Sequence, residues 1–443
     1  MHDIAVIGLG FVGLTTAAFF ASRGLKVHGV DKDIERNNAL KEMKVPFFEP
    51  KLQEYVKKAF LSKRLTVGNE VQDGTVRSRY IFVCVGTPMT PKGKVDLTSI
   101  TKVSKDIGSA LKTTDNYKTV CIKSTVPPKT TEDIILAEIE RASNKVRYKD
   151  FGITFIPEFL SEGSAIKDIT KPHKNVIGTN DAKSLLSIDR LMSRLYGADT
   201  HTMKTNIITA ELIKYANNAF LATKISFINT IANICNILPG SDVDVVAKAI
   251  GLDPRIGNQF LIAGPGYGGS CLPKDLSGFI MSCKETGYVP ILLKAVRDVN
   301  NDQVIIIMNI LKKKLGILNG KAISILGTAF KKNTDDIRES VAIKLISELK
   351  NVAKVKVHDP KALDNTRKLF GNSIQYSYSI DEAVAGCDCL IIMTDWDQYK
   401  GITETQIIKN NKNRYILVVD TRRLLKIKNT DTIDYVALGQ NVS

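Results

Sequence analysis

Short apolar runs alternate with helix-like stretches along the chain up to about residue 200. The runs read IAVIG, KVHGV, YIFVCVG, KTVCIKST, FGITFIP and KNVIG. Runs of this kind between helical segments are typical of parallel strands with helices on both faces of the sheet. The pattern therefore predicts a doubly wound α/β domain in this part of the chain.

A long helical pattern follows, from about Thr209 to Leu238, without glycine or proline until Pro239 and Gly240. Apolar residues cover much of its circumference, so we expect it to be buried between domains or against a second copy of the chain. A second α/β pattern begins near Gly320, with AISILG, VKVHDP, CLIIMTD and YILVVDTR as strands. It is similar to another nucleotide-binding half but lacks a GxGxxG motif, so we expect it to hold a different ligand.

A glycine motif follows the first apolar run. Gly8, Gly10 and Gly13 form G-x-G-x-x-G, and Asp31 ends the second run at about the expected spacing of ~20 residues. The glycines allow a tight turn, close approach of a pyrophosphate and close packing of helix on strand, and the helix N-terminus faces the phosphates. Asp31 would accept hydrogen bonds from the adenosine ribose and repel a 2′-phosphate. The motif therefore predicts NAD rather than NADP.

Polar side chains follow three of the predicted strands. Thr87 follows one strand, Ser124 and Thr125 follow another, and Glu158 and Glu162 follow a third. Ligands of doubly wound sheets bind beyond the carboxyl ends of the strands, so we expect these side chains to open onto one crevice.

The segment GPGYGGSCLPKD, residues 264–275, places a cysteine where a glycine-rich turn meets a helix. Cys271 would lie at or just before the helix N-terminus, where the dipole and free amides favour the thiolate. Asp275 follows one turn later, and a thiol beside a carboxylate suggests covalent acyl chemistry. Lys214 and Asn218 share one face of the long helix. The alternatives are a space-filling cysteine and an ordinary helix surface.

Composition indicates the class of protein and the cellular compartment in which this chemistry would occur. Hydrophobic residues make up 44% and charged residues 24% of 443 residues, which is ordinary for globular domains. No apolar run approaches the ~20 residues of a membrane span, and the first residues already predict a strand, so we expect no signal peptide. The seven cysteines lack framework or metal-site spacing. We therefore expect a cytoplasmic protein with reduced thiols, no membrane partner and no metal.

The formal charge of +16 attracts polyanions and anionic small molecules alike. The basic residues are spread widely, without a long basic tail or a nucleic-acid fold signature, so no nucleic-acid partner is expected. In the segment GTAFKKNTDDIRES, Lys331 and Arg338 could contact phosphates. We interpret the excess charge mainly as solvated surface, with a few positions recruited for a phosphorylated substrate.

Several motifs in a fixed order resemble those of the nucleotide-sugar 6-dehydrogenases, the UDP-glucose/GDP-mannose dehydrogenase family, over essentially the full length. They are IAVIGLGFVGL, VGTP, IKSTVPP, IPEFLSEGSA, ELIKYANNAFLATK, GLDPRIG, GPGYGGSCLPKD, AFKKNTDDIRES, VHDP and VVDTRR. The resemblance implies an α/β fold of two Rossmann-like doubly wound domains joined by a long central helix, the usual homodimer contact. It implies an NAD-binding domain at residues 1–205, a central helical dimerisation and catalytic region at 206–310 and a nucleotide-sugar-binding domain at 311–443.

The resemblance also assigns roles to individual residues. The catalytic set is Cys271 as nucleophile with Lys214, Asn218, Asp275, Glu158 and Thr125. The cofactor contacts are Gly8, Gly10, Phe11, Val12, Gly13, Asp31, Arg36, Thr87, Ser124, Glu162 and Arg338. The substrate contacts are Glu158, Phe159, Leu160, Glu162, Lys214, Asn218, Arg255, Phe260, Gly266, Gly268, Lys331 and Arg422, with Arg255 often serving a partner subunit.

The implied reaction is a twofold, NAD-dependent oxidation of a nucleotide sugar through a thiohemiacetal and a thioester on Cys271. Lys214 and Asn218 would stabilise the oxyanion, and a water activated by Glu158 would hydrolyse the thioester. The segments PEFLSEGSA and AGPGYGGSC are most similar to members that convert UDP-glucose to UDP-glucuronate. Oxidation of GDP-mannose or a UDP-N-acetylhexosamine is the enzymatic alternative. A non-catalytic NAD or nucleotide-sugar sensor is the other, although binding alone does not need a nucleophile.

Overall fold

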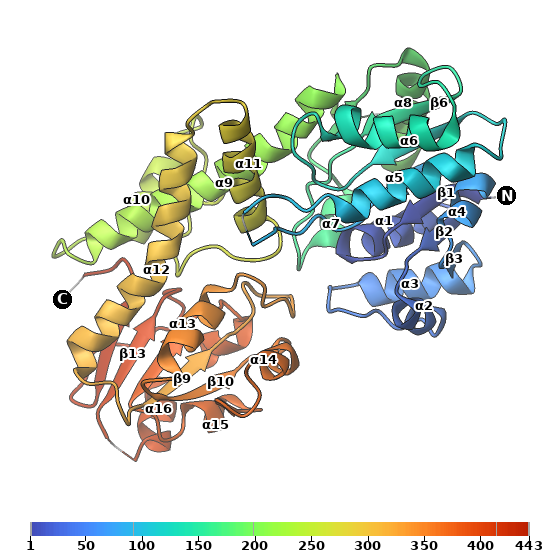
Figure 1. Cartoon of the computed structure of the whole chain (residues 1–443). Helices are drawn as coiled ribbons and strands as arrows, with labels where there is room; N and C mark the ends of the chain where they lie inside the picture. The colour runs from blue at the N-terminus through green and yellow to red at the C-terminus, as the bar shows by residue number, and fades with distance from the viewer. Residues whose placement is uncertain (1, 92, 198, 413, 442–443) are drawn as a thin grey trace. The chain divides into compact units, whose positions relative to one another are not determined.

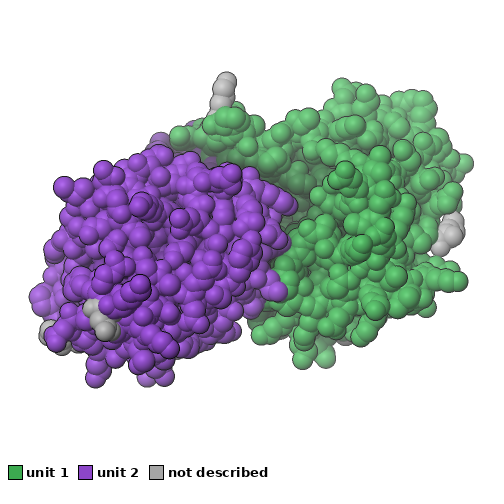
Figure 2. Space-filling model, turned by 90° about the horizontal axis from the view of Figure 1, so that it is seen from below, with its two compact units in different colours: residues 1–217, 281–286 green, residues 218–280, 287–443 purple. Residues whose placement is uncertain are grey.

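The computed structural model describes residues 2–91, 93–197, 199–412 and 414–441. The chain divides into two compact units, shown in Figure 2. The first unit contains residues 1–217 and 281–286, and the second contains residues 218–280 and 287–443.

The first unit is built on a sheet, of which Figure 1 labels β1, β2, β3 and β6. Within the described residues this sheet has eight strands, in the order β3-β2-β1-β4-β5-β6-β7-β8. The strands are β1 (His2–Ile7), β2 (Val27–Val30), β3 (Leu65–Gly68), β4 (Ser78–Val83), β5 (Lys118–Ile122), β6 (Phe151–Phe155), β7 (Asn175–Gly178) and β8 (Thr202–Thr205). The pairs are parallel except β6 with β7, where Phe155 pairs antiparallel with Gly178. The wholly parallel sheet suggested by the apolar runs is therefore corrected at this end, a common variation near the edge of a doubly wound sheet.

Helices cover both faces of this sheet. Their bounds are α1 (Phe11–Ser22), α2 (Ile34–Lys41), α3 (Leu52–Leu61), α4 (Val71–Arg77), α5 (Thr98–Leu111), the π-helical turn η1 (Thr131–Leu136), α6 (Ala137–Ser143), α7 (Ala165–Thr170), α8 (Ala182–Tyr196) and α9 (Ile207–Cys235). On one face, side chains of α1, α3, α7 and α8 form a core with the strands. On the other face, the core includes α5, η1, α6 and the start of α9. Alternate strand residues therefore point into two separate cores, which explains the nearly continuous apolar runs.

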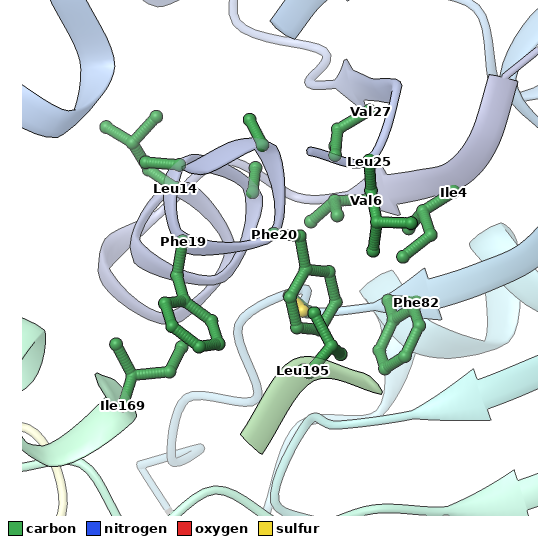
Figure 3. Packing of buried hydrophobic residues seen from close by; sticks show 14 of the residues in the cluster. Ile4, Val6, Leu14, Phe19, Phe20, Leu25, Val27, Phe82, Ile169 and Leu195 are labelled. Atoms are coloured by element: carbon green, nitrogen blue, oxygen red, sulfur yellow. The ribbon is translucent and has the colours of Figure 1, made fainter. Parts of the chain in front are cut away.

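Aromatic rings fill the core beneath α1, as Figure 3 shows. Phe20 meets Phe82 of β4 edge to face, with the ring centroids 5.1 Å apart, and both rings are fully buried. Phe19 lies on the same helix, stacked at 5.4 Å on Tyr196 at the end of α8. This packing fixes α1, whose N-terminus follows the glycine motif, against the central strands.

The second unit contains a sheet that has six described strands, in the order β11-β10-β9-β12-β13-β14. They are β9 (Ala322–Leu326), β10 (Lys354–His358), β11 (Gln375–Tyr376), β12 (Cys389–Ile392), β13 (Ile416–Asp420) and β14 (Ile433–Ala437). The helical elements are α10 (Val243–Gly251), α11 (Leu272–Glu285), α12 (Ile291–Leu315), α13 (Val341–Leu349), α14 (Leu363–Phe370), α15 (Ile380–Val384), η2 (Asp397–Gly401) and α16 (Glu404–Asn410). Residues 281–285 of α11 are counted with the first unit. Side chains of α12, α13 and α14 pack on one face and those of α15, η2 and α16 on the other.

Both sheets share one topology, because β11-β10-β9-β12-β13-β14 repeats the order of β3-β2-β1-β4-β5-β6. This is the order of a dinucleotide-binding doubly wound fold, so the predicted fold class is confirmed. Helix α9 is continuous across the boundary between the units at Asn217 and Asn218. It ends at Cys235 rather than at the predicted Leu238, and the N–H of Ile237 closes a turn on the carbonyl of Ile234, three residues earlier. The domain boundaries at 205/206 and 310/311 stay predictions.

Among the described residues, no helix combines the length and the apolar character that crossing a membrane requires.

A buried carboxylate ties the start of α9 to the turn before η1. Glu211 is 0% exposed and accepts the N–H groups of Lys129 at 2.6 Å and Thr131 at 2.9 Å. Burial raises the pKa of Glu211 from its ordinary 4.5 to about 7, even though these hydrogen bonds favour the charged form. At a pH between 4.5 and about 7, Glu211 is therefore mostly protonated in the folded chain and mostly ionised in the unfolded chain.

This proton predicts a pH dependence of folding. Between pH 4.5 and about 7 the folded state binds more protons, so stability falls as pH rises through this window. In Glu211→Gln this part of the slope should vanish, because glutamine does not titrate. Urea unfolding at several pH values measures the slope, with the exposed glutamate of α3, Glu54→Gln, as a matched control. Equal slopes in the wild type and Glu211→Gln would contradict the assignment.

Candidate active site

The glycine motif of the first unit leaves room for a ligand at one position and for nothing at the other two. Gly8 has φ 90°, and a Cβ there would lie 2.8 Å from the carbonyl oxygen of Cys84. A Cβ at Gly13 would lie 1.7 Å from the carbonyl oxygen of Gly8. A Cβ at Gly10, directly before α1, would meet no atom within 4 Å. Two glycines therefore serve close packing and the third borders open space, which fits a dinucleotide pyrophosphate.

Asp31 holds the turn of this motif in place. The carboxylate, at the end of β2, is 8% exposed and accepts the N–H of Leu9 at 2.7 Å and that of Asp33 at 3.0 Å. Arg36 of α2 pairs with it at 2.9 Å. The predicted contacts Phe11 and Val12 form the first two positions of α1. These residues surround the helix N-terminus, where an anionic ligand is favoured.

The ends of β4 and β5 are joined by side-chain hydrogen bonds. The hydroxyl of Thr87 donates to the carbonyl of Thr125 at 2.7 Å, and that of Ser124 donates to the carbonyl of Val85 at 2.7 Å. These three predicted residues are therefore brought together at the carboxyl edge of the sheet.

Beyond β6, a buried ion pair joins Glu158 to Lys214 of α9. The ammonium Nζ lies 2.9 Å from Oε1 of Glu158 and 2.5 Å from its carbonyl oxygen, and both side chains are buried. The N–H of Leu160 donates to Oε2 at 2.6 Å. Burial alone would raise the pKa of Glu158, but Lys214, the N–H of Leu160 and the charge of Lys123 hold it below its ordinary value. Glu158 is therefore a carboxylate at neutral pH.

The rest of the segment after β6 lies around this pair. The ring of Phe159 lies 5.4 Å from the ammonium of Lys214 and 4.5 Å from that of Lys174. Glu162 is 8% exposed, and Leu160 is half-buried. The next residues are fixed by Glu49, which accepts the N–H groups of Gly163 at 2.6 Å and Ala165 at 2.8 Å.

In the second unit, the candidate nucleophile stands directly before α11. Cys271 is partly exposed and not in a disulfide, and its carbonyl accepts the N–H of Asp275 at 2.8 Å to start the helix. Asp275 is 1% exposed, and its carboxylate accepts Asn218 Nδ2 at 2.6 Å and Lys274 Nζ at 2.6 Å. The hydroxyl of Ser270 lies 3.5 Å from the sulfur. The amide of Asn218 and the carboxylate of Asp275 are therefore in contact, and Cys271 lies one helical turn before Asp275.

The glycine-rich loop before Cys271 is closely packed. A Cβ at Gly266, where φ is 116°, would lie 2.8 Å from Asn300 Oδ1, and one at Gly268 would lie 2.4 Å from the carbonyl oxygen of Glu339. Arg422 donates to the carbonyl of Met393 at 2.9 Å and lies against Gly264. The loop geometry therefore depends on glycine at these positions.

Four of the predicted residues have side chains that are exposed or only half-buried. Phe260 has φ 66° and is 39% exposed, and Lys331 is half-buried with its ammonium 5.6 Å from the ring of Phe330. Arg255 is 87% exposed and pairs with Asp253 at 2.6 Å. Arg338 is 62% exposed and pairs with Asp336 at 2.6 Å. It belongs to the second unit, whereas the other predicted cofactor contacts belong to the first.

Sequence reasoning missed two lysines. Lys274 pairs with Asp275, and Lys123 is buried and its charge helps to lower the pKa of Glu158. Each stands next to a predicted residue, in the segments CLPKD and IKST, but neither spacing nor residue type indicated its partner. Within the described part of the chain, no group of three or more potential ligands could hold a metal ion.

A dinucleotide cradle, a buried lysine–carboxylate pair and a cysteine at a helix start are features of dehydrogenases that use a nucleophilic thiol. The chain belongs to the UDP-glucose/GDP-mannose dehydrogenase family. Residues 2–198 match its NAD-binding domain, residues 208–302 its central domain and residues 324–427 its UDP-binding domain.

Similar proteins include the UDP-glucose 6-dehydrogenases TuaD of Bacillus subtilis and AglM of Haloferax volcanii. The first is 39% identical and the second 38%, each over 98% of this chain, with 92% and 100% of the relatives covered. The structure is similar to that of a UDP-glucose dehydrogenase from Pyrobaculum islandicum, with a TM-score of 0.89, 34% identity and 98% of each chain covered. It is also similar to a UDP-D-ManNAc dehydrogenase from Pyrococcus horikoshii, with a TM-score of 0.87, 25% identity and 99% of each chain covered.

The two kinds of glycine predict opposite outcomes for alanine. Gly10→Ala should change stability by less than about 0.5 kcal/mol, because its methyl group meets open space. It should weaken NAD binding at least about tenfold, because the pyrophosphate needs that space. Gly13→Ala should lower stability by about 1–3 kcal/mol or more through overpacking. Calorimetric titration with NAD and thermal melting separate the two effects. An unchanged NAD affinity in Gly10→Ala would contradict a pyrophosphate site at Gly10.

Proposed function

We propose that this protein oxidises the C6 alcohol of UDP-glucose to the carboxylate of UDP-glucuronate in two steps at Cys271. The observation that carries the proposal is the unbridged, partly exposed thiol before α11, one turn from the buried Asp275. UDP-glucose is the substrate named for the relatives that share 38–39% of their residues with this chain. The domain matching residues 324–427 supports a uridine nucleotide as the substrate carrier.

The cofactor is NAD, because residues 2–198 belong to the NAD-binding domain of the family and Gly10 leaves the space a pyrophosphate needs. Gly8, Gly10, Phe11, Val12 and Gly13 would hold its phosphates, and Asp31 would face its ribose. When bound, NAD supplies a hydride acceptor for each of the two oxidations. One alcohol, two NAD and one water give one carboxylate, two NADH and three protons.

The chain's own residues would transfer the protons and form the carbon–sulfur bond. Asp275, paired with Lys274 and Asn218, is the candidate base for the hydroxyl proton, directly or through a water. The thiolate of Cys271 then bonds to the aldehyde carbon, which retains the intermediate on the protein. Lys214 and Asn218 are the candidate donors to the oxyanion.

Hydrolysis of the thioester would release the acid. Glu158 is held as a carboxylate by Lys214 and can take a proton from an attacking water. The water oxygen bonds to the acyl carbon, the carbon–sulfur bond breaks, and the thiolate of Cys271 is regenerated. Thr125 at the end of β5 and Glu162 after β6 are proposed to position substrate and cofactor.

Oxidation of GDP-mannose or a UDP-N-acetylhexosamine would use the same groups. The similarity to a UDP-D-ManNAc dehydrogenase supports a UDP-N-acetylhexosamine as the alternative substrate. We place the reaction in the cytoplasm, because Cys271 must stay reduced and all seven cysteines are unbridged.

The proposed reaction predicts a fixed stoichiometry and its dependence on one thiol. The wild type should release two NADH for each UDP-glucose, and Cys271→Ala should form no acid, because the aldehyde has no nucleophile to retain it. Cys283→Ala, which alters the other partly exposed cysteine, within α11, is the matched control. NADH absorbance with product mass spectrometry measures both quantities. Acid production by Cys271→Ala, or activity with GDP-mannose alone, would refute the proposal.

We also propose a homodimer through the second-unit part of α9. Phe220, Phe227 and Ile234 recur every seven residues along this helix and are 65%, 51% and 51% exposed. A regular apolar stripe of this kind is typical of a protein interface. Arg255, 87% exposed, is the proposed contribution of one copy to the site of the other.

Disruption of this stripe should produce monomers. Phe227→Glu places a charge in the proposed interface, and light scattering after size exclusion should report half the mass of the wild type. Leu369→Glu, at an equally exposed leucine of α14, should keep the wild-type mass. A monomeric wild type, or a dimeric Phe227→Glu, would contradict this interface.

A further inference from the structure

One peptide group of the loop before Cys271 is held from two sides by side chains of the second unit. The N–H of Gly264 donates to Oδ1 of Asn229 at 2.9 Å, and the carbonyl oxygen of Ala263 accepts Nη2 of Arg423 at 2.8 Å. Asn229, in α9, is 0% exposed, and the side chain of Arg423 is 4% exposed. The two loop groups belong to one planar peptide unit, so the two bonds fix its position and its orientation together.

Arg423, which follows β13, joins this peptide group to two other segments. Its Nε donates to the carboxylate of Asp244 in α10, 3.0 Å from each oxygen, and its Nη1 donates to the carbonyl of Leu438 after β14 at 3.0 Å. With the bond to Ala263, all three nitrogens of the guanidinium group are hydrogen-bonded. A guanidinium donates in fixed directions, so Arg423 holds its three partners in one arrangement, which a lysine cannot do.

The turn that carries Arg423 is fixed from within. Asp420, at the end of β13, is 0% exposed and accepts the N–H groups of Arg422 at 3.0 Å and of Leu424 and Leu425, each at 2.7 Å. Arg423 has φ 52°, in the left-handed region that favours glycine. Strained backbone of this kind persists where the surrounding contacts hold it, and it is common at ligand sites. The turn therefore gives each of its two arginines a fixed place.

Arg422 lies against the peptide group that Arg423 holds. Its Nε donates to the carbonyl of Met393 at 2.9 Å, and a Cβ at Gly264 would lie only 2.9 Å from its Nη1. A displacement of Gly264 would therefore displace the guanidinium group of Arg422. Arg422 is a proposed contact of the nucleotide sugar, so the position of this peptide group affects substrate binding.

The part of the loop nearer to Cys271 has anchors of its own. Asn300 of α12 accepts the N–H of Tyr267 at 2.8 Å and donates to the carbonyl of the same residue at 3.0 Å. The N–H of Gly269 donates to the carbonyl of Arg338 at 2.8 Å. These bonds lie between Gly264 and Cys271 along the chain, so a change at the first anchor leaves the thiol in place.

We propose that Arg423 is a positioning residue for the binding of the nucleotide sugar. Through Ala263 it fixes Gly264 against Arg422, and so it presents the guanidinium group of Arg422 to the phosphates of the substrate. It acts on substrate affinity rather than on turnover, because the thiol end of the loop is anchored separately. The inference deepens the proposed oxidation of UDP-glucose and rests on it.

The test compares substrate binding with turnover in five proteins: the wild type, Arg423→Met, Arg423→Lys, Gly264→Ala and the control Arg367→Met. Gly264→Ala keeps the bonds of Arg423 but pushes directly on Arg422. Arg367 of α14 donates to the hydroxyl of Tyr378 at 2.6 Å, next to β11 at the opposite edge of the sheet from β14. Calorimetric titration with UDP gives the affinity, NADH absorbance gives kcat and both KM values, and scanning calorimetry gives the melting temperature.

A split between KM and kcat is expected. In Arg423→Met the affinity for UDP should fall and the KM for UDP-glucose should rise, each about tenfold, the factor expected for one displaced hydrogen bond to a charged group. The kcat and the KM for NAD should be unchanged, because only binding of the nucleotide sugar is weakened. Arg423→Lys should recover part of the affinity, and Gly264→Ala should show the same split without a lower melting temperature. Arg367→Met should bind UDP like the wild type.

Wild-type affinity for UDP in Arg423→Met, or a fall in kcat without a rise in the KM for UDP-glucose, would overturn the inference and make Arg423 purely structural. If Arg423→Met does not fold, wild-type affinity in both Arg423→Lys and Gly264→Ala would overturn it instead. Failure of the proposed function gives a different result. A wild type that binds UDP but releases no NADH with UDP-glucose would refute the oxidation, and the UDP titrations would still decide the role of Arg423.

Discussion

The buried ion pair between Lys214 and Glu158 is the interaction on which the rest of the first unit's site depends. Lys214 binds both the carboxylate and the carbonyl of Glu158, so it fixes the side chain and the backbone of one residue at once. Removing one partner of such a pair typically costs about 3–5 kcal/mol, because the other is left charged in a dry place. With Glu211 one turn earlier also tied to backbone amides, the start of α9 is held at two points. Segment 158–165 and the start of α9 are therefore positioned together.

The two sheets share a topology but differ in how their acidic residues are used. Asp31 after β2 and Asp359 after β10 occupy corresponding places, and Gly8 and Gly327 both have positive φ, at 90° and 94°. Asp359 accepts four backbone N–H groups and the indole N–H of Trp396, so both of its carboxylate oxygens are already hydrogen-bonded within the protein. The loop from residue 327 to 340 also stands where the first sheet has a short turn into α1. Although the two sheets share a topology, only the first unit therefore has the glycine turn that can bind a dinucleotide.

The sequence predicted the central strands and the start of α11, because each is marked by a local pattern. The strands that it missed, β3, β8, β11 and β14, are the four edges of the two sheets. An edge strand needs only one hydrogen-bonded neighbour and exposes more of its side chains, so β3 and β8 show no apolar run. In the candidate site, glycines and Cys271 were found through turn chemistry. Lys274 and Lys123 were missed, because the surroundings of a lysine are decided by tertiary packing.

The net charge of +16 hides two different uses of buried lysine in the first unit. Lys118 donates to two carbonyl oxygens, whereas Lys214 donates to the carbonyl oxygen and to the carboxylate of Glu158. Burial penalises each charge, so the partner of each lysine indicates what the position is for. Carbonyl partners alone stabilise the fold, whereas the ion pair with Glu158 also lowers the pKa of that carboxylate. The cost of burial, rather than the number of basic residues, therefore distinguishes these two lysines from the solvated surface.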